Sequence, residues 1–175
     1  YHPYSYMYRT GHSITALTLY TSDGLYSTSD FDSKGNLLSK YPHSTLDGKG
    51  VKPGDIRYKD ISGDGVIDVN DKQYMDQYHT LPSAVYGIQL DQMEGLGFEA
   101  TFDGRINQYA MLTTGSIYWP LYNDDKNISM HYYNNRWTPE NQNARYPRLT
   151  TLSNGNNFQG GSDFWVEKSD WFKLR

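Results

Sequence analysis

The stretch from residue 84 to residue 107 most constrains the fold, because apolar and polar residues alternate along two consecutive runs. Side chains of a strand point to opposite sides in turn, so every second residue shares a face. One face holds Ala84, Tyr86, Ile88, Leu90, Leu96, Phe98, Ala100, Phe102, Gly104 and Ile106. The residues between them, such as Gln89 and Glu99, fall on the other face. With a tight connection at 93–95, the two runs predict a β-hairpin.

The hairpin has two readings. Each predicted strand has about 9–11 residues, the length that crosses a bilayer at the tilt of a barrel strand. A barrel wall needs one apolar face for lipid and one polar face for water, but a soluble sheet lying on a core shows the same alternation. The segments 27–83 and 108–163 on either side are both long. A short turn at one end and long loops at the other are typical of outer-membrane barrels, so the asymmetry favours the barrel.

The rest of the chain also favours strands over helices. It has 17 Tyr, four Trp and six Phe residues, and aromatic residues are enriched in strands. Strands are predicted at 13–20 and 55–58, and a further one begins within 164–175. Asn70 or Asp71 predicts the cap of a short helix at 72–78. The predicted class is all-β, as a fragment of a large transmembrane antiparallel β-barrel with long extracellular loops.

A cluster of oxygen donors lies at 60–71, in a twelve-residue run whose spacing matches a calcium loop. Gly65 stands where such a loop turns sharply, and the last position is Asp rather than the usual Glu. The run before it is strand-like, unlike a helix–loop–helix pattern. The predicted ligands are Asp60, Ser62, Asp64, Val66, Asp68 and Asp71. We predict a structural Ca²⁺ here; the alternative is an Asx-rich turn without metal.

Several classes of function receive no support. The chain has no cysteine, which excludes disulfides and thiolate sites. A net charge of −4 without a basic stripe gives no support to nucleic-acid binding. The five His residues lack ligand spacing, and no Gly-x-Ser-x-Gly run is present. A glycosidase pair such as Glu94 and Glu99 would depend on a separation in space that a sequence does not supply. We predict no catalytic residues and no enzyme.

Four motifs occur in order along the chain. They read Y-T-S-D-G-L-Y at 20–26, P-G-D-I-R-Y-K-D at 53–60 followed by G-D-G-V-I-D at 63–68 and N-D at 70–71, R-W-T-P-E-N-Q-N-A at 136–144 with Y-P-R-L at 146–149, and S-D-F-W-V-E at 162–167 through W-F-K-L-R at 171–175. Together they resemble motifs of the SusC/RagA-type TonB-linked outer-membrane transporters. Gln142 stands where that family often has Pro, and 77–83 lacks its usual G-N-P-x-P-K-F.

The resemblance implies a large barrel in the outer membrane of a Gram-negative bacterium. Such a protein imports oligosaccharides or peptides with a SusD-like surface lipoprotein as its lid. TonB drives uptake through an N-terminal part that this chain lacks, so we expect residues 1–175 to be a C-terminal barrel segment. Its expected parts are an extracellular loop at 27–83 that contains 60–71, a transmembrane hairpin at 84–107, an extracellular loop at 108–163 and the start of a strand at 164–175.

Within that segment, two groups of residues are candidate contacts. Aromatic side chains of the second loop could stack on sugar rings or pack against the lid. They are Trp119, Tyr122, Tyr132, Tyr133 and Trp137. The alternative is an interfacial girdle or packing within the loop. Glu99, Asp103 and Arg105 would face the lumen and line the substrate path or bind the plug; the alternative is solvated lumen charge.

A second hypothesis comes from another class of protein. A soluble β-sandwich, stabilised by Ca²⁺, could bind carbohydrate through surface aromatics. Part of a glycoside hydrolase is the third and weakest hypothesis. Behaviour during extraction separates the first two, because an outer-membrane importer needs detergent and a soluble module does not.

Overall fold

The computed structural model describes residues 3–91, 99–112, 127–152, 154–158 and 161–175. These residues form small, mostly antiparallel sheets with little helix, which confirms the predicted all-β class. The one α-helix in these ranges is α1 (Met130–Asn134). Short 3-10 turns are η1 (Ser5–Met7), η2 (Thr28–Asp30), η3 (Val69–Asp71) and η4 (Asp163–Trp165). Among the described residues, no helix is long and apolar enough to cross a membrane.

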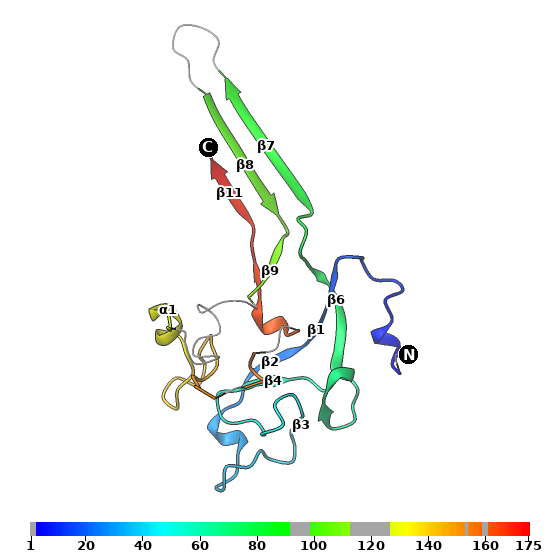
Figure 1. Ribbon diagram of the computed structural model, residues 1–175, viewed down its shortest axis with the longest axis vertical. Coiled ribbons are helices and arrows are strands. Elements are labelled where there is room, and N and C mark those ends of the chain that lie inside the picture. Colours follow the sequence, from blue (N-terminus) through cyan, green and yellow to red (C-terminus); the bar gives the residue numbers. More distant parts are fainter. Residues whose placement is uncertain (1–2, 92–98, 113–126, 153, 159–160) are drawn as a thin grey trace.

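The predicted hairpin is present and carries a third strand. β7 (Ala84–Asp91) pairs with β8 (Glu99–Ile106), and β11 (Trp171–Leu174) pairs with the other edge of β8. Ile88 lies opposite Phe102, and Phe102 lies opposite Leu174. Directly opposed residues share a face of an antiparallel pair, so the predicted apolar face is confirmed for the described part of the hairpin. This three-stranded sheet projects from the rest of the molecule (Figure 1).

A second ladder continues the first along the same strands. β9 (Tyr109–Met111) follows β8, and β10 (Val166–Lys168) precedes β11; the two pair antiparallel. Three residues separate Arg105 from Tyr109, whereas two separate Lys168 from Trp171. The extra residue makes a β-bulge, and Asn107 within it has a φ of 56°. β8 and β9 thus form one long strand that bends between the projecting sheet and the rest of the molecule.

The helix predicted at 72–78 is wrong, because this segment is β6 (Lys72–His79), paired antiparallel with β1 (Ala16–Tyr20). The predicted caps, Asn70 and Asp71, lie inside η3 instead, and Asp68 is the capping residue. The Asp68 carboxylate accepts the N–H of Asn70 at 2.7 Å and caps η3. Beyond η3, the backbone groups of β6 bond to a strand more than fifty residues away, a partner that local propensity does not register.

The two long segments, together with the adjoining residues 20–26 and 164–165, fold into one unit. β2 (Ser22–Leu25) pairs with β4 (Ile56–Tyr58), and β3 (His43–Ser44) runs parallel to β5 (Val66–Ile67). Their buried side chains pack against residues from the second segment and η4. The shared core consists of Tyr20, Ile56, Tyr58, Ile67, Tyr132, Tyr146, Phe158 and Trp165. Burial of large aromatic side chains from both segments stabilises the unit.

A buried polar cluster fastens the two segments to each other. Asp55 is 1% exposed, and its carboxylate accepts bonds from Arg148 Nε at 2.6 Å, Asn157 Nδ2 at 2.9 Å and Asn154 Nδ2 at 3.1 Å. The N–H of Lys52 donates to the same carboxylate at 2.8 Å. We call these side chains the Asp55 cluster. A buried charge persists only when it is paired and hydrogen-bonded, and here every partner but Lys52 comes from the second segment.

Candidate functional site

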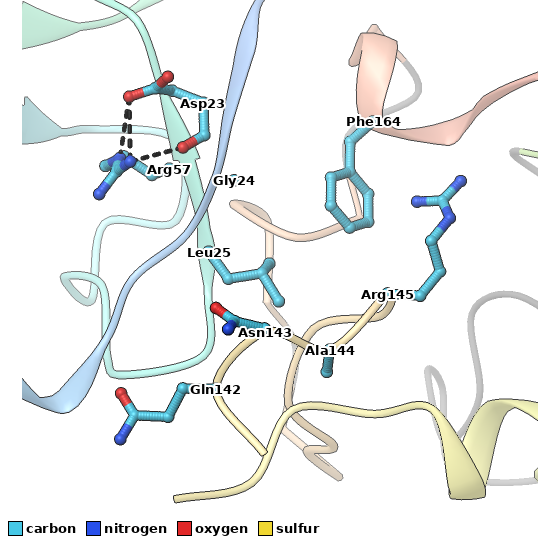
Figure 2. A pocket seen from close by; sticks show the side chains of 9 residues that line it. All are labelled: Asp23, Gly24, Leu25, Arg57, Gln142, Asn143, Ala144, Arg145 and Phe164. Atoms are coloured by element: carbon cyan, nitrogen blue, oxygen red, sulfur yellow. Dashed lines mark hydrogen bonds and ion pairs between the residues drawn. The ribbon is translucent and has the colours of Figure 1, made fainter.

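A cavity of about 430 Å³ lies where the two long segments meet, and we call it the junction cavity. β2 and β4 supply one wall, the segment 142–145 supplies another, and η4 supplies the third. Its lining residues are Asp23, Gly24, Leu25, Arg57, Gln142, Asn143, Ala144, Arg145 and Phe164. Figure 2 shows Leu25 and Phe164 directed into the cavity from opposite sides, with Asp23 and Arg57 at its edge.

Local bonds hold these walls in place. The register between β2 and β4 is irregular between Ser22 and Leu25, and Gly24 at that point has a φ of 87°. Ser162 caps η4 through its hydroxyl, which accepts the N–H of Phe164 at 3.2 Å. Across the cavity, the side-chain oxygen of Gln142 accepts the N–H of Thr28 at 3.1 Å. Residues from four separate parts of the sequence are thereby brought together around one space.

The two arginines of the junction cavity already have carboxylate partners. Arg57 pairs with Asp23 at 3.1 Å and with Asp30 at 3.8 Å. Arg145 pairs with Glu167, and its guanidinium lies 5.4 Å from the centre of the Phe164 ring. Because each cation is compensated nearby, the cavity offers hydrogen-bonding groups and apolar surface with little net charge. That combination suits an uncharged polar ligand better than an anion.

Asp30 is a buried carboxylate beside Arg57. Its burial opposes ionisation, but bonds from Tyr41 and Ser27 together with the charge of Arg57 lower the pKa of its carboxyl. The Tyr41 hydroxyl donates to it at 2.6 Å. Asp30 therefore stays ionised at neutral pH and pairs with Arg57.

The predicted calcium loop is folded by its own carboxylates. Asp60 accepts the N–H groups of Gly63 at 2.6 Å and Gly65 at 2.8 Å. Burial opposes its ionisation, yet these donors lower the pKa of Asp60. Asp71, which is fully buried, accepts the N–H groups of Ile61 at 2.9 Å, Ser62 at 3.0 Å and Asp68 at 2.8 Å. These bonds are those of an Asx-rich turn.

The other predicted ligands of this loop are less enclosed. The Asp64 carboxylate accepts the N–H of Val66 at 2.8 Å, and the Ser62 hydroxyl donates to Asp60 at 3.1 Å. Within the described ranges, no three His, Cys, Asp or Glu side chains are grouped so that they could hold a metal ion. The turn alternative accounts for the geometry, and Ca²⁺ binding stays a prediction.

The predicted aromatic contacts fall in different environments. Tyr132 is 1% exposed and stacks on Tyr146 with ring centres 4.5 Å apart. Trp137 is 7% exposed, and its ring lies against Gly54 so closely that a Cβ there would come within 2.6 Å of it. Both therefore fit the packing alternative. Tyr133 is 43% exposed, with the Arg136 guanidinium 3.7 Å from its ring centre. Trp119 and Tyr122 lie outside the described residues.

The predicted lumen-facing residues share one face of the projecting sheet. Asp103 pairs with Arg175 at 2.9 Å, and the Arg105 guanidinium lies 5.6 Å from the centre of the Trp171 ring. The Glu99 carboxylate accepts a bond from Gln89 Nε2 at 3.3 Å. All of these residues lie on the other face of the sheet from Phe102. The structure brings them together as the alternation predicts, and the contact of this face with a lumen stays a prediction.

Sequence reasoning missed the residues that build the junction cavity and the Asp55 cluster. Arg57 and Arg148 lie inside the motifs at 53–60 and 146–149, and the sequence predicts only a loop for the Asn-rich run at 154–157. Three asparagines beside one glycine do signal a backbone that needs side-chain bonds. Their carboxylate partner lies about a hundred residues away, so no local pattern identifies it.

The chain was also compared with known proteins. It matches no family model, no curated protein and no solved structure.

Proposed function

We propose that this chain is part of a TonB-dependent importer of the SusC/RagA type in the outer membrane of a Gram-negative bacterium. The sheet of β7, β8 and β11 forms part of the barrel wall, and the unit built from the two long segments lies outside the membrane. The importer takes up oligosaccharides or peptides together with a SusD-like surface lipoprotein. TonB acts through an N-terminal part of the importer.

The exposed apolar face of the projecting sheet carries this proposal. Five of its large side chains are about half exposed or more, although all lie within paired strands. They are Ile88 at 52%, Leu90 at 50%, Ile106 at 46%, Phe172 at 61% and Leu174 at 59%. Soluble monomers rarely expose a contiguous apolar patch of this kind, so lipid or another protein must cover it. In a barrel wall, lipid covers the apolar face.

The opposite face supports the same assignment. It carries the Asp103–Arg175 pair and the Arg105–Trp171 contact, which are suited to water. A barrel strand alternates between lipid-facing and lumen-facing residues in this manner. A lone three-stranded sheet is marginal in water, and both edges of this sheet, β7 and β11, are open to further strands among the described residues.

The junction cavity supplies a contact surface on the unit outside the membrane. Its compensated charges and its Leu25 and Phe164 side chains fit an uncharged, hydroxyl-bearing part of a substrate, or a polar loop of the lid lipoprotein. Tyr133 offers a second exposed aromatic ring on the same unit.

A matched pair of substitutions tests the membrane assignment in the intact protein. Ile88→Arg changes the apolar face, and Gln89→Arg changes the adjacent residue on the polar face. If both faces of the sheet stay in water, both changes are tolerated, because both positions are exposed. On a lipid-facing strand, an arginine near the midplane costs about 2–4 kcal/mol. We expect Ile88→Arg alone to be lost from the detergent-extracted outer-membrane fraction.

The soluble alternative gives the opposite result. If the intact protein dissolves without detergent and both variants behave like the parent, the importer assignment fails. The Ca²⁺-stabilised carbohydrate-binding module is then the better account.

A further inference from the structure

A second cavity, of about 360 Å³, lies in the first long segment, and we call it the lysine cavity. Its lining includes Leu37, His43, Lys49, Gly50, Val51 and Lys52. His43 belongs to β3, and the lining segments 35–37 and 49–52 lie at the end of the unit away from β7 and β8 (Figure 1). Its volume falls within the range of small-molecule sites, roughly 300–1,000 Å³.

Two lysines supply the positive charge of the lysine cavity. In the part of the chain that the structure describes, neither Lys49 nor Lys52 forms an ion pair or a side-chain hydrogen bond, and no Asp or Glu lines the cavity. Two nearby carboxylates accept backbone N–H groups, and one of them, Asp47, lines a smaller adjacent cavity together with both lysines. Asp32 accepts the N–H groups of Lys34 and Asn36, both at 2.8 Å, and Asp47 accepts the N–H of Gly155 at 3.0 Å.

The backbone fixes where the two lysines emerge. Gly48 and Gly50 have φ values of 64° and 77°, so left-handed turns lie on both sides of Lys49. The N–H of Lys52 donates to Asp55 at 2.8 Å, which ties this segment to the buried Asp55 cluster. Both lysine side chains are exposed, and the backbone of Lys52 is held by this bond.

The two cavities differ in charge although both are polar. In the junction cavity each arginine has a carboxylate partner, and the cavity is nearly neutral. Two lysines line the lysine cavity, and among the described residues neither has such a partner, in a chain whose net charge is −4. A concave wall with charge of one sign concentrates ligands of the opposite sign. His43 adds a ring nitrogen, and Leu37 and Val51 add apolar surface for a carbon skeleton.

We propose that the lysine cavity binds a small organic molecule with an oxyanion group, of the size of a sugar acid or a sugar phosphate. Lys49 and Lys52 bind the oxyanion through charge-assisted hydrogen bonds, and Leu37 and Val51 contact the carbon skeleton. This binding does not depend on the membrane assignment. A protein that fails the test with Ile88→Arg can still bind the ligand.

Calorimetric titration of the intact protein at low salt tests the proposal with three probes. They are glucuronate, glucose 6-phosphate and glucose, which differ in charge but share a ring. We expect glucuronate or glucose 6-phosphate to bind and glucose to bind at least about tenfold more weakly, because glucose makes no charge-assisted bond. The stronger of the two anions identifies a carboxylate or a phosphate as the preferred group. Raising the salt concentration should weaken binding of the anion.

A matched pair of double variants locates the site. Lys49→Gln with Lys52→Gln removes both cavity cations, and Lys34→Gln with Lys40→Gln removes two exposed cations that do not line the cavity. We expect the Lys49/Lys52 double variant to bind the anion about tenfold more weakly or worse. The Lys34/Lys40 double variant should bind it within about twofold of the parent. The proposal fails if no anion binding is detectable at millimolar concentration or if glucose binds as tightly as the anions. It also fails if the two double variants lose equal affinity for the anion.

Discussion

Asp163 shows how one buried carboxylate links stability to pH. Its carboxylate accepts the N–H of Ser22 at 2.7 Å, and burial raises the pKa of its carboxyl above the ordinary 3.8. The folded state therefore binds this proton more tightly than the unfolded state does. Stability falls as the pH rises from 3.8 through the raised folded pKa, and above that pKa the buried charge costs stability.

We expect Asp163→Asn to keep the acceptor for Ser22 and to remove the buried charge. The free energy of unfolding in urea, measured at several pH values, should then favour the variant increasingly as the pH rises through that window. Asp163→Ala removes the acceptor as well and should be less stable than Asp163→Asn at every pH. Parallel pH profiles for Asp163→Asn and the parent would contradict this role.

The calcium prediction also belongs to single residues. If the loop at 60–71 binds Ca²⁺, calorimetric titration of the intact protein should show one site, with a dissociation constant of about 10⁻⁴–10⁻³ M as in extracellular modules. Asp60→Ala and Asp64→Ala each remove a candidate ligand and should abolish the heat of binding. Asp32→Ala, outside the loop, is the control. Equal Ca²⁺ binding by the parent and all three variants would contradict a calcium site in this loop. The loop would then be an Asx-rich turn held by carboxylate–N–H bonds alone.

At the scale of the element, the bulge between β8 and β9 depends on Asn107. Its φ of 56° is left-handed, which a β-branched residue adopts only with strain. Ser169 donates its N–H to the Gln108 carbonyl at 2.8 Å, and Asp170 accepts the Gln108 N–H at 3.0 Å. Asn107 Nδ2 also donates to the Ser83 hydroxyl at 2.8 Å, which fastens β8 to the segment before β7.

We expect Asn107→Val to destabilise the intact protein by about 1–2 kcal/mol or more, because it forces a branched side chain into the left-handed region. Asn107→Gly retains the backbone conformation and loses only the bond to Ser83, so it should cost less. Thermal unfolding of the two variants compares them directly. A larger loss for Gly than for Val would show that the side-chain bond, and not the backbone conformation, is what matters at this position.

At the scale of the whole molecule, the Asp55 cluster joins segments about a hundred residues apart. Breaking a buried ion pair costs about 3–5 kcal/mol. We expect Asp55→Asn to fall at the lower end of that range, since Arg148 keeps 23% of its side-chain surface exposed. Asp23→Asn, on a carboxylate that is 50% exposed, should change stability by less than about 1 kcal/mol.

Hydrogen exchange in the intact protein measures whether the segments unfold as one. In Asp55→Asn, the amides of Ile56 and Phe158, which lie in different segments, should lose protection together, while those of β7 and β8 keep it. Ile56 donates its N–H to Asn157 Oδ1 at 2.8 Å, and Phe158 donates its N–H to the Asn154 carbonyl at 3.1 Å. Loss of protection in one segment alone would mean that the two fold independently.

Sequence alone determined the features whose physical cause is local. Side-chain direction in a strand repeats every two residues, so the apolar and polar faces around Ile88 and Phe102 could be predicted without any knowledge of the fold. The turn at 60–71 is likewise local, because Asp60 and Asp71 bond to N–H groups within twelve residues of the same run. The strand at 55–58 and the all-β class follow from the same kind of pattern.

Tertiary structure decided everything that depends on a distant partner. The segment at 72–78 is a strand because β1 supplies its bonds, and Tyr132 and Trp137 are core residues because the two long segments close over them. Asp55 could be charged and buried only once Arg148 and the asparagines came within bonding distance. Burial and pairing across a hundred residues are properties of the folded chain, since an individual segment contains one partner of each contact and not the other.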